Sequence, residues 1–170
     1  MWEQQEAHTV FSTSIDYRRI IVHEGARWTN VIDDWARGLR SIPARRQYQQ
    51  NAMAIGFHCY FPVHLPSKYL ARDDNFRLSM GWLIHELAHV WQFQSMGWKY
   101  LTMALMAHIR EGVDVYDYGG IESLEKLRLQ GVRLKDYNLE QQAAILQDAY
   151  LHLSDSNHNS VWSAYIADVG

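Results

Sequence analysis

Residues 82–91 read Trp-Leu-Ile-His-Glu-Leu-Ala-His-Val-Trp, with two histidines four positions apart and a glutamate directly after the first. On an α-helix, positions i and i+4 lie one above the other on the same face, so His85 and His89 can offer ring nitrogens to one ion. Glu86 lies beside them, where a carboxylate can accept a proton from an ion-bound water. This H-E-x-x-H spacing is typical of zinc hydrolases, and it predicts a Zn²⁺ site held by both histidines with Glu86 as general base.

The segment around the motif is apolar. Between Leu78 and Gln94, Glu86 is the only acidic or basic side chain besides the histidines. A lone carboxylate in an uncharged helix is rarely left without a partner, which favours a metal site over a pair of ordinary core histidines. We expect a buried helix that begins near residues 73–75 and ends at Gly97.

The composition is that of an ordinary globular chain. Of its 170 residues 48% are hydrophobic and 21% are charged, with a net charge of -3. We therefore expect one domain over residues 1–170. Lys and Arg are not in excess, which argues against nucleic acid as a partner, and a cluster of arginines predicts a solvated turn and helix end: Arg37, Arg40, Arg45 and Arg46.

Cysteine use and the start of the chain bear on the compartment. The single Cys59 excludes an internal disulfide and leaves zinc ligation to histidines and carboxylates, and its apolar neighbours predict an inert buried thiol. The acidic segment Met1–Glu6 does not resemble a secretory signal, and no apolar run is long enough to span a membrane. We expect a cytoplasmic protein by default, or one exported by a dedicated secretion system without a cleavable signal.

Periodicity predicts an α+β chain that is mostly helical, with a small sheet packed on the buried motif helix. Runs of β-branched and aromatic residues predict a strand at 19–23 and one or two strands at 51–61, with a bend at Gly56. Helical spacing predicts helices at 28–40, from 98 or 100 to 111, through 121–127, and from 136 or 138 to 153, with a final element at 161–166. Polar segments predict loops at 114–120 and 154–160.

A catalytic zinc ion normally has three protein ligands. The longer motif H-E-x-x-H-x-x-G-x-x-H is excluded because Gln92 and Ser95 stand where it has glycine and histidine. We expect Glu140 as the third ligand, because it lies in the first turn of a capped helix beside a core-facing stripe.

Asp114 stays open as the main alternative third ligand. Residues 112–119 resemble the Gly-Thr-x-Asp-x-x-Tyr-Gly signature of aspartate-ligand zinc peptidases, with the aspartate one residue out of register. Four further alternatives are more simply interpreted as surface or helix-end residues: Glu111, Glu122, His108 and His152.

Residues 80–92, together with the expected strand before them, resemble the zincin-type metallopeptidase domains found with bacterial contractile injection and type VI secretion systems. The resemblance implies a zincin-like fold and hydrolysis of peptide bonds. In glutamate-ligand zincins the third ligand follows an asparagine on a downstream helix, and Asn138-Leu139-Glu140 is similar, with one residue between the two. The resemblance also implies a transition-state donor, for which the candidates are Tyr116, Tyr118 and Tyr137.

We therefore expect a zinc metallopeptidase that hydrolyses a polypeptide or a peptidoglycan peptide, with Zn²⁺ on His85, His89 and Glu140. The free edge of the strand before the motif helix is expected to hold an extended peptide by main-chain hydrogen bonds. Expected partners are a secretion-system component or an immunity protein, and the protein would then be an effector or toxin. The alternative is a catalytically silent, zinc-stabilised structural or adaptor module of a secretion apparatus.

Overall fold

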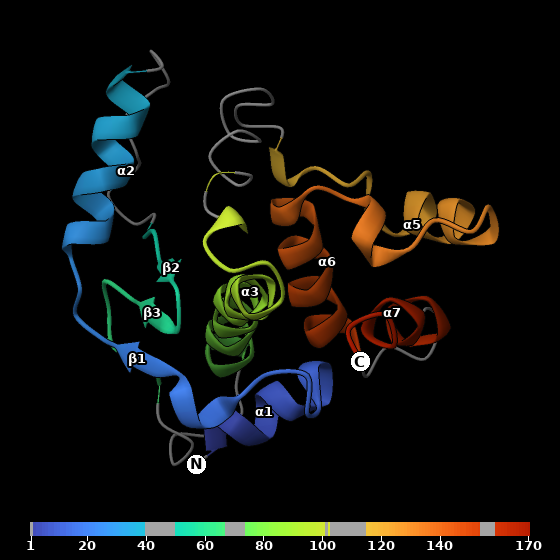
Figure 1. Ribbon diagram of the computed structural model, residues 1–170, viewed down its shortest axis with the longest axis horizontal. Helices are drawn as coiled ribbons and strands as arrows, with labels where there is room; N and C mark the ends of the chain where they lie inside the picture. Colours follow the sequence, from blue (N-terminus) through green and yellow to red (C-terminus); the bar gives the residue numbers. More distant parts are fainter. Residues whose placement is uncertain (1, 40–49, 67–73, 101, 103–114, 154–158) are drawn as a thin grey trace.

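The computed structural model describes residues 2–39, 50–66, 74–100, 102, 115–153 and 159–170. Figure 1 shows the arrangement of its elements. The α-helices are α1 (Trp2–Phe11), α2 (Trp28–Leu39), α3 (Asp74–Met96), α5 (Gly120–Leu129), α6 (Leu139–His152) and α7 (Asn159–Ile166); the 3-10 helices are η1 (Tyr17–Arg19) and η3 (Leu134–Asp136); the strands are β1 (Ile21–His23), β2 (Met53–Ile55) and β3 (His58–Tyr60). The expected α+β class, mostly helical with a small sheet, is confirmed.

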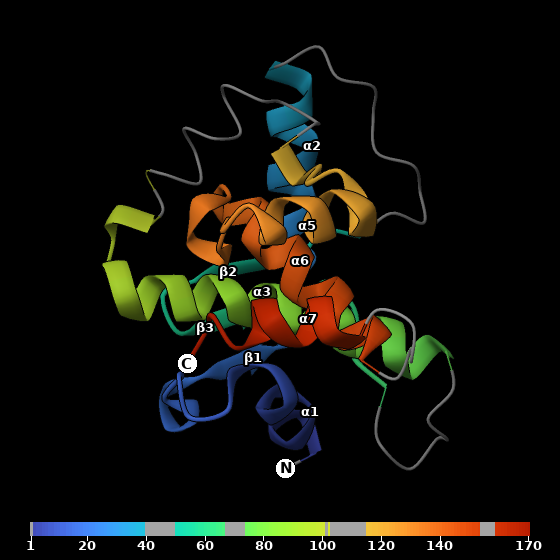
Figure 2. The same ribbon diagram turned by 90° about the vertical axis from the view of Figure 1, so that its right-hand side faces the viewer.

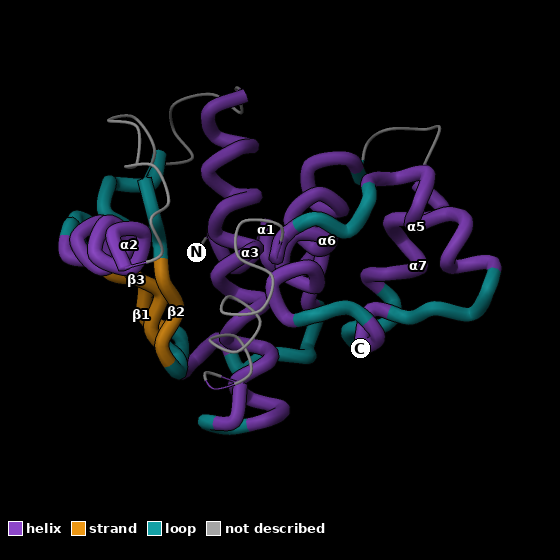
Figure 3. Tube along the Cα trace, turned by 90° about the horizontal axis from the view of Figure 1, so that it is seen from above, coloured by secondary structure: helices purple, strands orange, loops and turns teal. Residues whose placement is uncertain are grey.

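Helix α3 runs through the middle of the molecule. Viewed from above, the sheet lies on one side of it and α6 on the other, with α2 outside the sheet and α5 and α7 outside α6 (Figure 3). Helix α1 packs beneath α3 (Figure 2). Helix α3 ends at Met96 because Gly97 adopts a left-handed φ of 61°, a conformation that favours glycine. The expected buried helix from residues 73–75 to Gly97 is confirmed.

The small sheet has the strand order β1-β3-β2, with β1 parallel and β2 antiparallel to β3. Strands β2 and β3 form a hairpin, and Gly56 in its turn has a φ of 64°, so the expected bend at this glycine is a tight turn. Ala54 and Cys59 belong to the buried core that the sheet shares with α3. The other face carries the stacked rings of His23 and Tyr60. Ala54 and Cys59, the central residues of β2 and β3, thus bind the sheet to the central helix.

Helix α6 packs along α3 and contributes much of the core. Leu146 and Ala143 of α6 are fully buried and belong to the hydrophobic core. A Cβ atom on Gly81 of α3 would lie 3.0 Å from the Leu151 side chain, so the two helices approach closely at this point. Asn138 begins α6 by accepting a hydrogen bond from the Gln141 backbone N–H. This packing fixes the position of the first turn of α6 relative to α3.

Several expected boundaries differ from those observed. The strand expected from residue 19 begins at Ile21, because residues 17–19 form a 3-10 turn that the Asp16 side chain caps. The final element begins at Asn159 and is helical. The helix expected from 98 or 100 to 111 lies mostly outside the described residues. Within the described ranges, none of the helices is both long and apolar enough to cross a membrane.

We expect Leu146→Ala to lower the free energy of unfolding by about 2–5 kcal/mol, because it leaves a cavity in the hydrophobic core. Urea denaturation measures this change. The matched control is Leu129→Ala at the end of α5, where the leucine is 91% exposed and the effect should stay within about 0.5 kcal/mol. Equal effects of the two substitutions would contradict the assignment of Leu146 to the core.

Candidate metal centre

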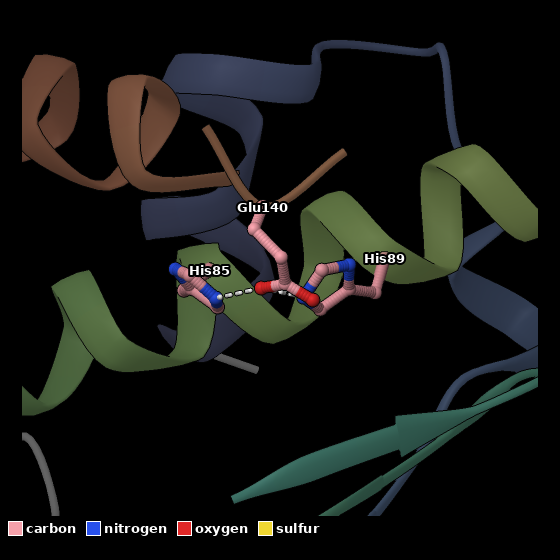
Figure 4. Close-up of side chains that lie close together, drawn as sticks. All are labelled: His85, His89 and Glu140. Atoms are coloured by element: carbon pink, nitrogen blue, oxygen red, sulfur yellow. Dashed lines mark ion pairs between the residues drawn. The ribbon is translucent and has the colours of Figure 1, made fainter. Parts of the chain in front are cut away.

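Two helices bring the three expected ligands together (Figure 4). Helix α3 presents His85 and His89 one turn apart, and α6 presents Glu140 from its first turn. Glu140 Oε2 lies 3.6 Å from Nε2 of His85 and 3.4 Å from Nε2 of His89. One donor atom from each residue lies within 4.8 Å of the other two, and among the residues that the structure describes this is the one group of three His, Cys, Asp or Glu side chains with that property.

Burial makes the charges of Glu140 and His89 depend on each other. The two residues are only 6% and 8% exposed. Burial raises the pKa of Glu140, but the charge of His89 and hydrogen bonds from both histidines outweigh it and hold this pKa well below its usual range. Burial likewise lowers the pKa of His89, but the charge of Glu140 outweighs it and raises the pKa to about 9. Without an ion, the site therefore holds an imidazolium facing a carboxylate.

Glu86 lies on the same helix but outside this group of three. It is 4% exposed, and its Oε2 atom is buried with no hydrogen-bond partner in the described part of the chain. Burial raises the pKa of Glu86; the charges of His85 and His89 oppose that shift, and the charge of Glu140 adds to it. Glu86 thus has, on the helix that carries both candidate histidines, an acceptor oxygen that none of the described residues uses.

The donor set fits a divalent cation. Glu86 and Glu140 bury two carboxylates close together, which is unfavourable unless positive charge or several donors face them. Two imidazole nitrogens and one carboxylate oxygen are ordinary ligands of Zn²⁺, and three protein ligands leave a fourth position for water. The residues present could therefore hold such an ion and would be stabilised by it.

Of the three tyrosines expected as donors, Tyr116 is the one that lies beside the candidate ligands. Its ring centroid is 6.0 Å from that of His85. Burial raises the pKa of Tyr116, and the nearby charges of Glu140 and Glu86 raise it further, so the hydroxyl stays protonated at neutral pH. A protonated hydroxyl can donate a hydrogen bond to a developing negative charge.

The other two expected tyrosines bond elsewhere. The Tyr118 hydroxyl donates to Asp148 on α6. The Tyr137 hydroxyl lies 3.2 Å from the Tyr165 hydroxyl on α7. Both hydroxyls therefore bond to side chains on α6 or α7.

The first turn of α6 holds the loop that carries Tyr116. The Asn138 side-chain amide donates to the Val115 carbonyl at 3.0 Å, and the Gln141 side-chain amide donates to the Asp117 carbonyl at 2.7 Å. Tyr116 lies between these two anchored carbonyls. The loop and the Glu140 ligand thus share one support.

Gln92 is a residue of the site whose role the sequence alone did not indicate. Its Oε1 atom lies 2.9 Å from Nδ1 of His89, and its Nε2 atom donates to the Leu139 carbonyl at 2.9 Å and to Gln142 Oε1 at 3.2 Å. In the sequence Gln92 served only to exclude the longer histidine motif. The sequence does contain one signal for this role: Gln92 is a polar side chain in an apolar helix, and it follows His89 by three residues, which places both on one face.

The alternative third ligands are not brought to the site in the part that the structure describes. Asp114, Glu111 and His108 lie outside that part. Glu122 is exposed on the first turn of α5, and His152 is exposed at the end of α6, where its ring stacks on Trp162.

Comparison with known proteins identifies one relevant likeness. The chain is similar to the solved effector domain of Pseudomonas aeruginosa VgrG2b, with a TM-score of 0.57 and 27% sequence identity over 97% of this chain and 78% of that chain. No family model matches the chain, and no curated protein matches it. The similarity spans the helices that carry the candidate ligands, and it is to a domain described as an effector.

Proposed function

We propose that the protein is a zinc-dependent metallopeptidase and that it acts as an effector of a bacterial secretion system. The observation that carries the enzymatic half is the convergence of His85, His89 and Glu140, with a buried oxygen of the neighbouring Glu86 that has no partner in the described part of the chain. The likeness to an effector domain over 97% of the chain supports the second half. Secretion by a type VI system is part of this proposal.

In the proposed mechanism, His85, His89 and Glu140 hold the ion. A bound Zn²⁺ supplies a water of lowered pKa and polarises the carbonyl of the substrate. Glu86 would act as the general base and take up a proton at Oε2, an atom that is buried and has no partner among the described residues. It would then give that proton to the leaving amine, which completes hydrolysis of the peptide bond.

We assign the transition-state donor role to Tyr116. Of the three candidates it is the one whose ring lies next to a candidate ligand, 6.0 Å from the ring of His85. Its protonated hydroxyl would stabilise the oxyanion that forms when water adds to the carbonyl.

The expectation that the strand before the motif helix has a free edge is wrong, because β3 lies between β1 and β2 and is paired on both sides. We therefore place the substrate peptide on β2, an edge strand of the sheet. Strands β2 and β3 are joined by a two-residue turn, so the Ile55–His58 pair exchanges backbone hydrogen bonds and the next pair, Ala54–Cys59, does not. The backbone N–H and carbonyl of Ala54 therefore point away from β3, toward the free edge. The Ala54 carbonyl accepts the Tyr100 hydroxyl at 2.5 Å. A peptide added at this edge would therefore pair with the Ala54 N–H. Because the Ala54 carbonyl already accepts from Tyr100, the peptide would form fewer backbone hydrogen bonds than a fully free strand edge allows.

Glu86→Gln should keep the zinc and the fold but reduce hydrolysis by about 10² or more, because glutamine preserves size and polarity and removes the basicity. Zinc content is measured by elemental analysis, and activity is measured on an unstructured protein and on peptidoglycan peptides. The matched control is Glu122→Gln, an exposed residue of α5. If zinc-loaded wild type cleaves neither substrate and Glu86→Gln binds and folds identically, the structural-module alternative replaces the enzyme.

Zinc affinity should rise with pH between 7 and 9. In the metal-free protein the pKa of His89 is about 9, so below that pH the ring carries a proton that must leave before Nε2 can bind an ion. Each pH unit in this range should strengthen binding up to about tenfold, and binding at pH 7 should release about one proton from His89. Calorimetry in buffers of different ionisation enthalpy measures the release, and a pH-independent affinity would contradict this charge state.

Tyr116→Phe should lower kcat by roughly 10²-fold with little change in KM, because the lost hydrogen bond forms only in the transition state. Steady-state kinetics on a peptide substrate separates the two constants. Tyr137→Phe is the control, since its hydroxyl bonds to Tyr165. A wild-type kcat in Tyr116→Phe would remove this residue from the mechanism.

A further inference from the structure

We propose that Gln92 is a positioning residue that fixes the ligating form of His89 and ties it to the turn of α6 that carries Glu140. This inference rests on the proposed metal site and assigns a role to a residue that does not itself bind the ion. Gln92 is 1% exposed and follows His89 by three residues on α3, so its amide lies beside the imidazole ring.

Two backbone carbonyls fix the direction of a chain of side-chain amides. The Tyr137 carbonyl can only accept, so the nitrogen of Gln142 must face it, at 2.8 Å. The oxygen of Gln142 then faces Nε2 of Gln92 at 3.2 Å. The same nitrogen donates to the Leu139 carbonyl at 2.9 Å, another group that only accepts. The oxygen of the Gln92 amide is thereby turned toward His89.

The orientation of Gln92 decides which nitrogen of His89 carries the proton. An amide oxygen only accepts, so Nδ1 of His89, at 2.9 Å, must be the donor. The neutral ring then keeps its lone pair on Nε2, which is the atom 3.4 Å from Glu140. A metal ion binds through that lone pair. A reversed amide would place the proton on Nε2 and remove His89 from the ligand set.

Gln92 also joins the two helices that supply ligands. It lies on α3 beside His89, and it donates to Leu139, the residue directly before Glu140. The two hydrogen bonds from Gln92 to α6 span 47 and 50 residues of sequence. Because the groups are buried, breaking these bonds would leave polar atoms without partners. The tether therefore fixes the position of Glu140 relative to His89 at the precision that a metal site requires.

A neutral amide suits this position better than a carboxylate. Metal-binding histidines often donate their second N–H to a carboxylate, which also raises the basicity of the ring. Here Glu86 and Glu140 already place two buried carboxyl groups at the site. A third would be unfavourable, and it could not donate to the Leu139 carbonyl.

The test replaces Gln92 with methionine, which has a similar length and no amide. In the full chain, Gln92→Met should weaken zinc binding by about 10- to 100-fold, measured by competition with a chromophoric chelator. The matched control is Gln94→Met on the same helix, where the glutamine oxygen accepts from the Asp16 backbone at 3.2 Å and zinc affinity should stay at the wild-type value. Circular dichroism establishes that both variants are folded.

A double variant tests whether the amides act in series. Gln142 acts on His89 only through Gln92, so Gln92→Met combined with Gln142→Met should bind zinc about as weakly as Gln92→Met alone. Independent contributions would instead add. Additive losses would overturn the idea of one directed chain.

Nitrogen NMR of the zinc-loaded wild type gives a readout that needs no variant. We expect the metal on Nε2 of His89 and a proton on Nδ1. Zinc bound through Nδ1, or an undiminished zinc affinity in folded Gln92→Met, overturns the inference about Gln92 and leaves the proposed function standing. Wild-type protein with no zinc affinity overturns both.

Discussion

The carboxylate of Glu140 lies in the interior, 3.4 Å from Nε2 of His89 and 3.6 Å from Nε2 of His85. A buried carboxylate destabilises a protein unless cations or donors face it, and Glu86 adds a second one nearby. The two histidines supply part of the compensating positive charge, and a divalent ion would supply more. Because the ligands come from α3 and α6, the arrangement depends on the packing register of these two helices. The close approach of Gly81 to the opposite helix is part of that register.

The first turn of α6 serves the site in four ways. Asn138 begins the helix and holds the backbone before Tyr116, while Gln141 holds the backbone after it. Glu140 supplies the third candidate ligand, and Gln142 orients the amide that contacts His89. Consecutive helical side chains point in different directions around the axis, which lets one turn reach the loop, the ligands and the central helix together. The positions of ligand and proposed donor are therefore set jointly.

The motif helix and the class of fold were predictable because both depend on local pattern: an apolar segment with one carboxylate, bounded by an acidic start and Gly97. The placement of Glu140 near buried surface was predictable for the same reason, from the cap and the stripe of its helix. The order among the tyrosines was not, because it depends on long-range hydrogen bonds that position the loop around Tyr116. The hydrogen bond from Gln92 to the Leu139 carbonyl could not be predicted from the sequence either, because the two residues are 47 positions apart. Local periodicity carries no information on such pairings.

The long sequence separation between the two halves of the site has a consequence for how the chain is handled before it folds. An unfolded chain keeps His85 and His89 near each other, but Glu140 joins them only when a long segment closes and α6 docks on α3. That closure is entropically unfavourable until the core packs around it. Capture of a metal ion at this candidate site would therefore be coupled to tertiary structure. A chain held open by a chaperone or threaded through a pore would be chemically latent, and the proposed hydrolytic site would be assembled only where the protein folds.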